Sequence, residues 1–310
     1  LLTCPPMLRA VEHFKQRFQE EGFDVHCPNV VQTMSEEELI ELLPQFDGWI
    51  IGDDPATRRV FEAGKRGNLK AAVKWGVGVD NVDFEAAKDL GIPITNTPGM
   101  FGAEVADIAQ GYLIGLARET YLIDRHVRQG EWPKPTGISL KGKTLGLIGF
   151  GDIGRNVAKR ALASDMQVIA YDPYYKADAE LTVEQGEWPN ELDRCDFLVF
   201  TCALTSTNRH MLNSETISKL KNGVRVVNVA RGPLIDEAAL IENLSNGKIH
   251  SAALDVMENE PLASDSELRE FERCIFGSHN ASNTIDAVVA TSFKAIDHLR
   301  GFLKEVATAS

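Results

Sequence analysis

The stretch that decides the fold is Thr144-Leu-Gly-Leu-Ile-Gly-Phe-Gly-Asp-Ile-Gly154. Its first five residues form an apolar run of strand length, and the residues after Gly154 repeat apolar side chains at helical spacing. A G-x-G-x-x-G turn between a strand and a helix is typical of a dinucleotide-binding βαβ unit. We therefore predict that residues 149–154 bind the pyrophosphate of a dinucleotide. The competing interpretation is an ordinary turn between strand and helix.

The three glycines of this turn serve different purposes. Gly149 allows a tight turn, Gly151 lets the backbone approach a pyrophosphate, and Gly154 lets the helix pack closely against the strand. Asp152 and Ile153 lie between them at the start of the helix, whose N–H groups and dipole attract phosphates. We expect all five residues to contact the cofactor.

An acidic residue follows the next apolar run, residues 168–171, and completes the pattern. Asp172 lies about 20 residues beyond the glycines, where a carboxylate accepts hydrogen bonds from the adenosine ribose. The same carboxylate would repel the extra phosphate of NADP, and residues 173–175 offer no arginine to bind it. The sequence therefore predicts NAD as the cofactor. In the competing interpretation Asp172 caps a helix.

Short apolar runs alternate with helical patterns along the chain. The expected strands are residues 1–4, 48–51, 71–73, 93–95, 144–148, 168–171, 197–201, 224–229 and 251–255. The clearest helical patterns are residues 10–21, 36–43, 103–128, 237–246 and 285–304. This alternation predicts an α/β fold in which parallel sheets are covered by helices on both faces.

The chain is long enough for two domains. The turn Asn96-Thr-Pro-Gly99 comes before the long helical pattern 103–128, and after the polar connection 130–143 a fresh series of βα units begins. We therefore predict a first domain of residues 1–97 and a second of residues 98–283. Periodicity alone does not indicate which of them the final helix packs on.

Composition excludes several classes of partner. The 310 residues include 32 Lys and Arg against 45 Asp and Glu, a formal net charge of −13, so we do not expect nucleic acid as a partner. No apolar run has the length that spans a bilayer, and residues 1–8 lack a basic leader. We expect no membrane association and a cytoplasmic location. Because Leu1 lies inside an expected strand, we also expect a few residues to precede it.

The cysteines indicate neither a disulfide framework nor a metal site. Their number is odd, they form no C-x-x-C pair, and no cluster of histidines lies near them. The five are Cys4, Cys27, Cys195, Cys202 and Cys274. We interpret most of them as small core residues, with a catalytic thiol as the weaker alternative.

Three late segments embed a charged side chain in apolar or glycine-rich surroundings near the end of a strand. They are Asn228-Val-Ala-Arg-Gly232, Ala253-Leu-Asp-Val-Met-Glu-Asn-Glu-Pro261 and Gly277-Ser-His-Asn280. Open α/β sheets bind ligands at the ends of their strands. An anionic ligand would have to be bound by such local groups, because the chain as a whole is negative.

In these segments the chain resembles the D-isomer-specific 2-hydroxyacid dehydrogenase family, and within it the phosphoglycerate dehydrogenase-like members. The resemblance covers nearly the whole length. It includes Trp75-Gly-Val-Gly-Val-Asp-Asn-Val-Asp83, Asn96-Thr-Pro-Gly99, the glycine turn and the three late segments.

The resemblance implies a fold, a reaction and a cofactor. The expected fold class is α/β with two doubly wound parallel-sheet domains: a Rossmann NAD-binding domain, residues 98–283, and a flavodoxin-like substrate domain, residues 1–97 with 284–310. The expected reaction is NAD-dependent hydride transfer between a D-2-hydroxy acid and a 2-oxo acid, without a metal. One candidate pair is 3-phosphoglycerate and 3-phosphohydroxypyruvate.

The resemblance also assigns catalytic roles. Arg231 is expected to bind the substrate carboxylate and polarise the reacting oxygen, for which a guanidinium is well suited. His279 is expected to move the proton. Glu260, hydrogen-bonded to the other ring nitrogen, is expected to orient His279 and favour its protonated form. Taken singly, the three could instead be a surface ion pair, a solvated loop residue and a histidine without a special role.

Further contacts follow from the same resemblance. The backbone at Val77 and Gly78 is expected to bind the substrate carboxylate, although these residues also suit a simple tight turn. Asp255 is expected to contact the nicotinamide carboxamide, or else to cap the end of a strand. The remaining expected contacts are Thr205, Val229 and Ala230 for the cofactor and Lys74 for the substrate.

Two segments depart from the family pattern. Residues 280–284 after His279 read Asn-Ala-Ser-Asn-Thr, where relatives more often have apolar residues and glycine. Residues 52–55 read Gly-Asp-Asp-Pro, acidic where arginine would help to bind a phosphate, and Lys74 is the nearest obvious cation. The sequence therefore leaves glyoxylate or hydroxypyruvate reduction as the alternative activity.

Two further expectations concern partners and regulation. The family includes dinucleotide-sensing corepressors, but the set of Arg231, Glu260 and His279 favours an enzyme. The helical pattern 103–128 resembles the helix through which the family dimerises, so we expect a homodimer. Because the sequence ends at Ser310, we do not expect feedback through an amino-acid-binding regulatory domain.

Overall fold

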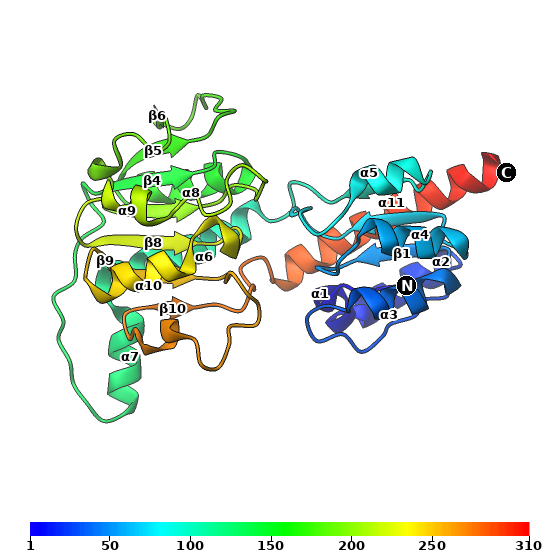
Figure 1. The fold of residues 1–310 in the computed structure, drawn as a ribbon, viewed down its shortest axis with the longest axis horizontal. Helices are drawn as coiled ribbons and strands as arrows, with labels where there is room; N and C mark the ends of the chain where they lie inside the picture. The colour runs from blue at the N-terminus through cyan, green and yellow to red at the C-terminus, as the bar shows by residue number, and fades with distance from the viewer. Residues whose placement is uncertain (310) are drawn as a thin grey trace. The chain divides into compact units, whose positions relative to one another are not determined.

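A computed structural model, which describes residues 1–309, divides the chain into two units (Figure 1). Unit 1 consists of residues 1–101 and 283–309, and unit 2 of residues 102–282. Each unit has its own parallel sheet and its own hydrophobic core. The predicted α/β fold class is thereby confirmed.

Unit 2 is built on a seven-stranded sheet in the order β10-β9-β8-β7-β4-β5-β6, in which all neighbouring strands are parallel. The strands are β4 (Thr144–Ile148), β5 (Gln167–Tyr171), β6 (Glu184–Gly186), β7 (Phe197–Phe200), β8 (Val224–Asn228), β9 (Ile249–Leu254) and β10 (Ile275–Phe276). The strand order reverses between β4 and β7. In open sheets of this type that reversal opens a crevice at the carboxyl ends of the strands.

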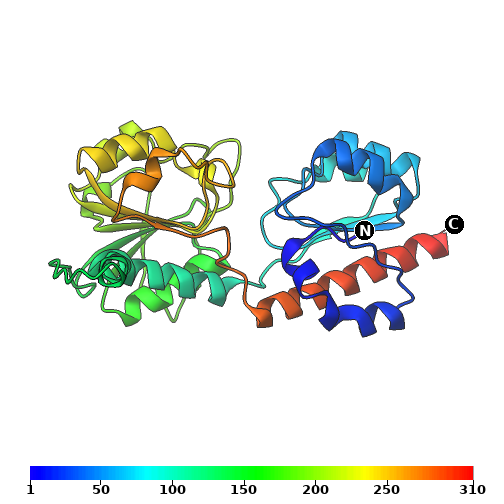
Figure 2. The same cartoon turned by 90° about the horizontal axis from the view of Figure 1, so that it is seen from below.

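Burial on both faces explains the apolar sequences of the central strands. Every residue of β4, β7 and β8 is buried, as parallel strands between two layers of helices require. Figure 2 shows α6 (Gly102–Arg118) and α8 (Asp152–Ala163) below this sheet and α10 (Glu237–Ser245) above it. The remaining segments are α7 (Thr120–Arg128), α9 (Ser214–Ser218), η3 (Leu192–Arg194), η4 (Gly232–Leu234) and η5 (Glu267–Glu270).

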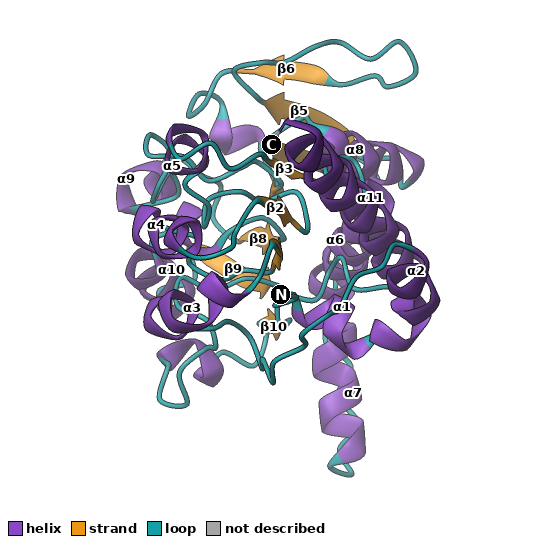
Figure 3. Cartoon of the chain, turned by 90° about the vertical axis from the view of Figure 1, so that its right-hand side faces the viewer, coloured by secondary structure: helices purple, strands orange, loops and turns teal. Residues whose placement is uncertain are grey.

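The expected single helix over residues 103–128 is wrong, because the chain breaks at Glu119 into α6 and α7. Glu119 has a left-handed backbone, with φ of 54°, which an uninterrupted helix does not contain. Its buried carboxylate lies 3.5 Å from His250 Nε2 and 3.4 Å from Arg273 Nε. After the break, α7 projects away from the sheet of unit 2 (Figure 3).

Unit 1 has a shorter parallel sheet in the order β1-β2-β3. Its strands are β1 (Gly48–Ile51), β2 (Ala71–Lys74) and β3 (Ile94–Asn96), and their carboxyl ends lie in register, Ile51 opposite Lys74 and Lys74 opposite Asn96. The helices are α1 (Pro5–Arg9), α2 (Lys15–Glu20), α3 (Glu36–Leu42), α4 (Arg58–Arg66), α5 (Phe84–Asp89) and α11 (Ile285–Ala309), with η1 (Val11–Phe14) and η2 (Leu43–Gln45).

The first expected strand, residues 1–4, is reduced to a single parallel bridge between Leu2 and Ile50. Leu2 N–H also donates to the His26 carbonyl at 3.0 Å, so this segment extends the sheet beside β1 without forming a full strand. Pro5 and Pro6 lack N–H groups and begin α1 directly afterwards, which ends the pairing.

The last helix, α11, packs on the sheet of unit 1. Figure 2 shows it beneath the sheet, on the side opposite α3 and α4. Its contact is close: a Cβ at Gly48 on β1 would lie 3.1 Å from the Leu299 side chain. This packing answers the question that periodicity left open. Over residues 1–309, no helix has both the length and the apolar character needed to cross a bilayer.

Candidate active site

The strands of unit 2 end at one level, and several of the predicted site residues follow directly after them. Ile148 at the end of β4 pairs with Tyr171 and Phe200, Phe200 pairs with Asn228, and Asn228 pairs with Leu254. The residues immediately beyond these ends include Gly149, Asp172, Val229 and Asp255. The fold therefore gathers side chains that are far apart in the sequence at the edge where α/β sheets bind ligands.

The glycine turn between β4 and α8 has the geometry that a dinucleotide site needs. Gly149 has φ of +97°, and a Cβ there would lie 2.7 Å from the Cys202 backbone nitrogen. A Cβ at Gly154 would lie 2.2 Å from the Gly149 carbonyl oxygen, which shows how closely helix and strand approach. Gly151 faces open space instead, and Asp152 and Ile153 begin α8 directly after it. This cradle fits a pyrophosphate.

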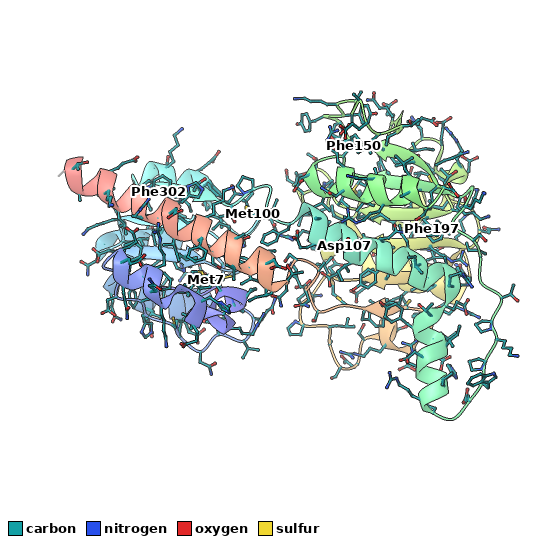
Figure 4. All side chains as sticks on the ribbon, turned by 180° about the vertical axis from the view of Figure 1, so that it is seen from behind. Met7, Met100, Asp107, Phe150, Phe197 and Phe302 are labelled. Atoms are coloured by element: carbon teal, nitrogen blue, oxygen red, sulfur yellow. The ribbon has the colours of Figure 1, made fainter. Side chains whose placement is uncertain are left out.

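Asp172 is bound to the same turn. Its carboxylate accepts a hydrogen bond from Phe150 N–H at 2.6 Å and another from Tyr174 N–H at 2.7 Å. Phe150, labelled in Figure 4, follows Gly149 at the end of β4. These bonds hold the carboxylate at the end of β5 with acceptor capacity to spare, because each oxygen has more than one lone pair.

Sequence reasoning missed Arg155, which the first turn of α8 places beside the segment after Asp172. Its guanidinium lies 4.4 Å from the centre of the Phe150 ring and 3.0 Å from Asp178 Oδ2, and it donates to the Lys176 carbonyl at 2.8 Å. Hydrogen bonds from Glu180 N–H and Arg155 lower the pKa of Asp178. Residues 173–175 contain no arginine, but the fold places Arg155 beside the segment that follows Asp172.

The expected cofactor contacts at the ends of β7 and β8 differ in exposure. Thr205 is exposed in the loop after β7, where its N–H donates to Asn208 Oδ1 at 2.7 Å. Val229 and Ala230 are buried directly after β8. Their backbone is the part that the family resemblance assigns to the cofactor groove, and Ala230 N–H donates to Asn228 Oδ1.

Arg231 is held by its own short loop. Asn228, buried at the end of β8, donates from Nδ2 to the Arg231 carbonyl at 2.9 Å and accepts from Ala230 N–H at 3.0 Å. The guanidinium Nη1 donates to the Ala230 carbonyl at 2.9 Å. Asn228 therefore holds the backbone around Arg231 in place. It is the first residue of the predicted site segment 228–232, but the sequence indicated no role for it.

Glu260 and His279 lie side by side. His279 Nδ1 is 2.8 Å from Glu260 Oε2, and Glu260 Oε1 accepts a hydrogen bond from Met257 N–H at 3.1 Å. Both side chains are only about a quarter exposed. His279 has a left-handed backbone with φ of 55°, held by a bond from its N–H to the Asp255 carbonyl. The structure brings together the pair that the sequence predicted.

Asp255 caps the loop that carries His279. Its buried carboxylate accepts hydrogen bonds from Asn280 N–H at 3.1 Å and Ala281 N–H at 2.9 Å. Burial, together with the charge of Asp255, raises the pKa of the Tyr112 hydroxyl. The strand-end cap is therefore present, and it does not use all the lone pairs of the carboxylate.

A second carboxylate connects the loop that contains Glu260 to a neighbouring loop. Glu258 Oε1 lies 2.6 Å from His210 Nε2 and 2.8 Å from Arg209 Nη2. These partners belong to the loop that also contains Thr205, and Glu258 precedes Glu260 by two residues. The Arg231 loop approaches as well, since a Cβ at Gly232 would lie 1.7 Å from the Met257 carbonyl oxygen. The side chains predicted to be catalytic thus lie on loops that contact one another.

In unit 1 the other predicted residues lie at the carboxyl end of β2. The Lys74 side chain is only 3% exposed, and its Nζ lies 3.1 Å from Asp53 Oδ1 and 2.9 Å from the Trp75 carbonyl. Gly76 has φ of +115°, and its N–H donates to Thr97 Oγ1. The Val77 carbonyl accepts a bond from Asn96 Nδ2, which orders the backbone before Gly78.

The chain belongs to the D-isomer specific 2-hydroxyacid dehydrogenase family, whose NAD binding domain matches residues 110–281. It is 39% identical over 261 residues to a hydroxypyruvate reductase of Thermotoga maritima, a match that covers 83% of this chain and 84% of the relative. A D-3-phosphoglycerate dehydrogenase of Methanocaldococcus jannaschii is 38% identical over 89% of this chain, which spans only 54% of that relative.

Solved structures agree with this membership. A glyoxylate reductase from Paecilomyes thermophila superposes with a TM-score of 0.82 at 30% identity, covering 96% of this chain and 93% of that one. The chain is therefore an oxidoreductase of the 2-hydroxyacid dehydrogenase class, and its cofactor is NAD. The open space at Gly151 and the acceptor Asp172 fit that cofactor.

Proposed function

We propose that Arg231, Glu260 and His279 catalyse the interconversion of a small D-2-hydroxy acid and its 2-oxo acid. The observation that carries the proposal is the hydrogen bond between His279 Nδ1 and Glu260 Oε2. A histidine whose one ring nitrogen is held by a carboxylate can exchange a proton with a substrate through its other nitrogen. NAD, when bound, supplies or accepts the hydride.

In this mechanism the two polar groups of the substrate are bound differently. Arg231 binds the carboxylate, because its guanidinium can donate two parallel hydrogen bonds in a geometry that matches a carboxylate. His279 Nε2 donates a proton to the oxygen of the 2-oxo group during reduction and accepts it during oxidation. Glu260 stabilises the imidazolium and fixes the ring, while Asn228 holds the Arg231 backbone.

We propose a division of roles between the units. The glycine turn, Asp172, Thr205, the backbone at Val229 and Ala230, and Asp255 are proposed cofactor contacts of unit 2. Lys74 and the backbone at Val77 and Gly78 are proposed substrate contacts of unit 1, supported by their place at the carboxyl end of a parallel sheet.

For the substrate, we propose hydroxypyruvate or glyoxylate. Relatives that are similar over most of their own length include a hydroxypyruvate reductase and a glyoxylate reductase, whereas the phosphoglycerate dehydrogenase is matched over about half of its length. The test is NADH oxidation with hydroxypyruvate, glyoxylate, pyruvate and 3-phosphohydroxypyruvate, with His279→Gln as the control. Turnover of none of these by the wild type would contradict an enzymatic role and favour a dinucleotide sensor.

We also propose a homodimer formed through α6, α7 and the segment that follows them. No residue of α7 is buried, and Trp132 in the following segment is 77% exposed. Tyr121 and Val127 on α7 and Ile114 on α6 are exposed too. We propose that these side chains form one apolar patch, because a large contiguous patch of exposed apolar side chains marks an interaction surface.

Light scattering tests the dimer. We expect the wild type to have twice the mass of one chain and Trp132→Ala to shift toward that of a single chain at low micromolar concentration. Tyr174→Ala is the matched control, because Tyr174 is an equally exposed aromatic residue away from this surface. A monomeric wild type would contradict the proposal.

A further inference from the structure

The carboxyl end of the unit 1 sheet contains a nearly buried ion pair. Lys74 is the last residue of β2, and Asp53 follows the paired end of β1 by two residues. Their side chains meet at 3.1 Å, with Lys74 3% and Asp53 41% exposed. The ammonium group also donates to the Trp75 carbonyl. The positive charge of Lys74 is therefore compensated by a carboxylate that itself reaches solvent.

Further carboxylates lie near this end of the sheet. Asp54 is buried and accepts hydrogen bonds from Gly52 N–H, Met34 N–H and the Thr3 hydroxyl. Burial raises the pKa of its carboxyl group, because the charged form is less favourable away from water. The loop after β2 adds Asp80 and Asp83, and it lies against this region through a hydrogen bond from Ala56 N–H to the Asn81 carbonyl.

These charges bear on which anions can bind here. A substrate with one carboxylate brings a single negative charge, which backbone N–H groups of a glycine-containing loop can bind. A phosphorylated substrate brings about 1.5 to 2 further negative charges at neutral pH and needs uncompensated cations. Lys74 cannot act as one, because Asp53 already compensates it.

We propose that Asp53 is a specificity-determining residue that excludes phosphorylated substrates, so that the enzyme acts on small 2-oxo acids with a single carboxylate. The inference rests on the proposed function. Asp53 acts by holding the Lys74 ammonium and by presenting its own charge to the incoming anion. Lys74 and the sheet end would otherwise form a site for a phosphate.

The test compares kcat/KM for hydroxypyruvate and 3-phosphohydroxypyruvate, with NADH, in the wild type and in Asp53→Asn. The wild type is expected to prefer hydroxypyruvate at least about tenfold. In Asp53→Asn, the ratio of kcat/KM for hydroxypyruvate to kcat/KM for 3-phosphohydroxypyruvate is expected to fall about tenfold. The change is expected to come mainly from a lower KM for the phosphorylated substrate. The change should shrink at high salt, because Asp53 is partly exposed and its charge is screened.

Asp47→Asn is the matched control. Asp47 forms the equivalent pair with Lys70, at 2.7 Å, next to the opposite ends of the same two strands, and is 63% exposed. Its removal should leave the ratio unchanged. Circular dichroism and Tm of both variants exclude unfolding, and the wild-type ratio tests the inference even if Asp53→Asn folds poorly.

Three results separate the two proposals. A wild type that prefers 3-phosphohydroxypyruvate overturns the role of Asp53 while the reaction class stands. A ratio that is the same in wild type and a folded Asp53→Asn overturns it as well. Absence of turnover with every 2-oxo acid overturns the proposed function and with it this inference.

Discussion

Glu260 uses both of its carboxylate oxygens: Oε2 lies 2.8 Å from His279 Nδ1, and Oε1 accepts from Met257 N–H at 3.1 Å. The second bond fixes the carboxylate to the backbone of its own loop, so the first can fix the imidazole ring. Because both oxygens of the carboxylate are hydrogen-bonded, the side chain loses little further freedom when substrate binds, which is how a site is preorganised.

Replacement of His279 by glutamine should remove proton transfer and leave the cofactor site intact. We expect kcat to fall on the order of a hundredfold or more. The Kd for NADH, measured by fluorescence titration, should change little, because the glycine turn and Asp172 are untouched. Wild-type turnover in a folded His279→Gln protein would remove this residue from the mechanism.

Replacement of Glu260 by glutamine separates charge from geometry. The amide can still accept a hydrogen bond from Met257 N–H, but it no longer stabilises a positive imidazole ring. We expect a lower kcat and a pH optimum for 2-oxo acid reduction that moves to lower pH. Glu258→Gln is a useful comparison, since that carboxylate contacts His210 and Arg209 instead. An unchanged pH profile in Glu260→Gln would show that its charge is unimportant.

Asp172→Asn should relax the choice between cofactors. Removing the charge removes repulsion of a 2′-phosphate, and Arg155 lies beside the following segment, bound to Asp178 and the Lys176 carbonyl. We expect the ratio of kcat/KM for NADPH to that for NADH to rise about tenfold or more. Asp193→Asn, an exposed change on η3, is the control. Equal use of both cofactors by the wild type would contradict the role of Asp172.

Gly232→Ala should disturb the contact between the loop that contains Arg231 and the loop that contains Met257. A Cβ at this position would lie 1.7 Å from the Met257 carbonyl oxygen, a backbone atom that cannot move cheaply. Overpacking of this kind costs about 1 to 3 kcal/mol, and we expect a lower Tm together with a lower kcat. At Gly301 on α11 nothing lies within 4 Å, so Gly301→Ala should instead stabilise by roughly 0.5–1 kcal/mol. Equal Tm values for the two variants would refute this reading.

The cysteines should differ sharply in reactivity. Burial raises the pKa of Cys4 and Cys202 to about 12 and that of Cys195 and Cys274 to about 11, whereas Cys27 is exposed. We expect one thiol per native chain to react quickly with a thiol reagent at pH 8 and five after denaturation. Cys27→Ser should abolish the fast phase. A second fast thiol would contradict the burial seen here.

The same shifts predict how stability depends on pH. Because the folded pKa values of these thiols lie above the ordinary value of 9.0, their contribution is complete below pH 9 and is lost as the pH rises toward 11 to 12. Urea unfolding across this range should show a falling free energy of unfolding. A free energy of unfolding that stays constant across this pH range would mean that these thiols also have raised pKa values in the unfolded chain.

The sequence predicted most of the sheet because its strands are buried on both faces and therefore read as apolar runs. It failed where the backbone conformation depends on distant groups. Glu119 interrupts the expected long helix, and its carboxylate contacts His250 and Arg273 from segments more than a hundred residues away. The expected strand at residues 1–4 became one bridge because two prolines follow it at once.

By itself the sequence indicated the family and with it the reaction class, since the glycine turn, Asp172 and the segments around Arg231, Glu260 and His279 are local patterns that resemble those of the family. Only the tertiary structure decided how these residues are supported and how the charges at the end of the unit 1 sheet are paired. The pairing of Lys74 with Asp53 and the contact between His210 and Glu258 depend on which strand ends lie together. That register is set by packing of the whole sheet, which no local stretch of sequence encodes.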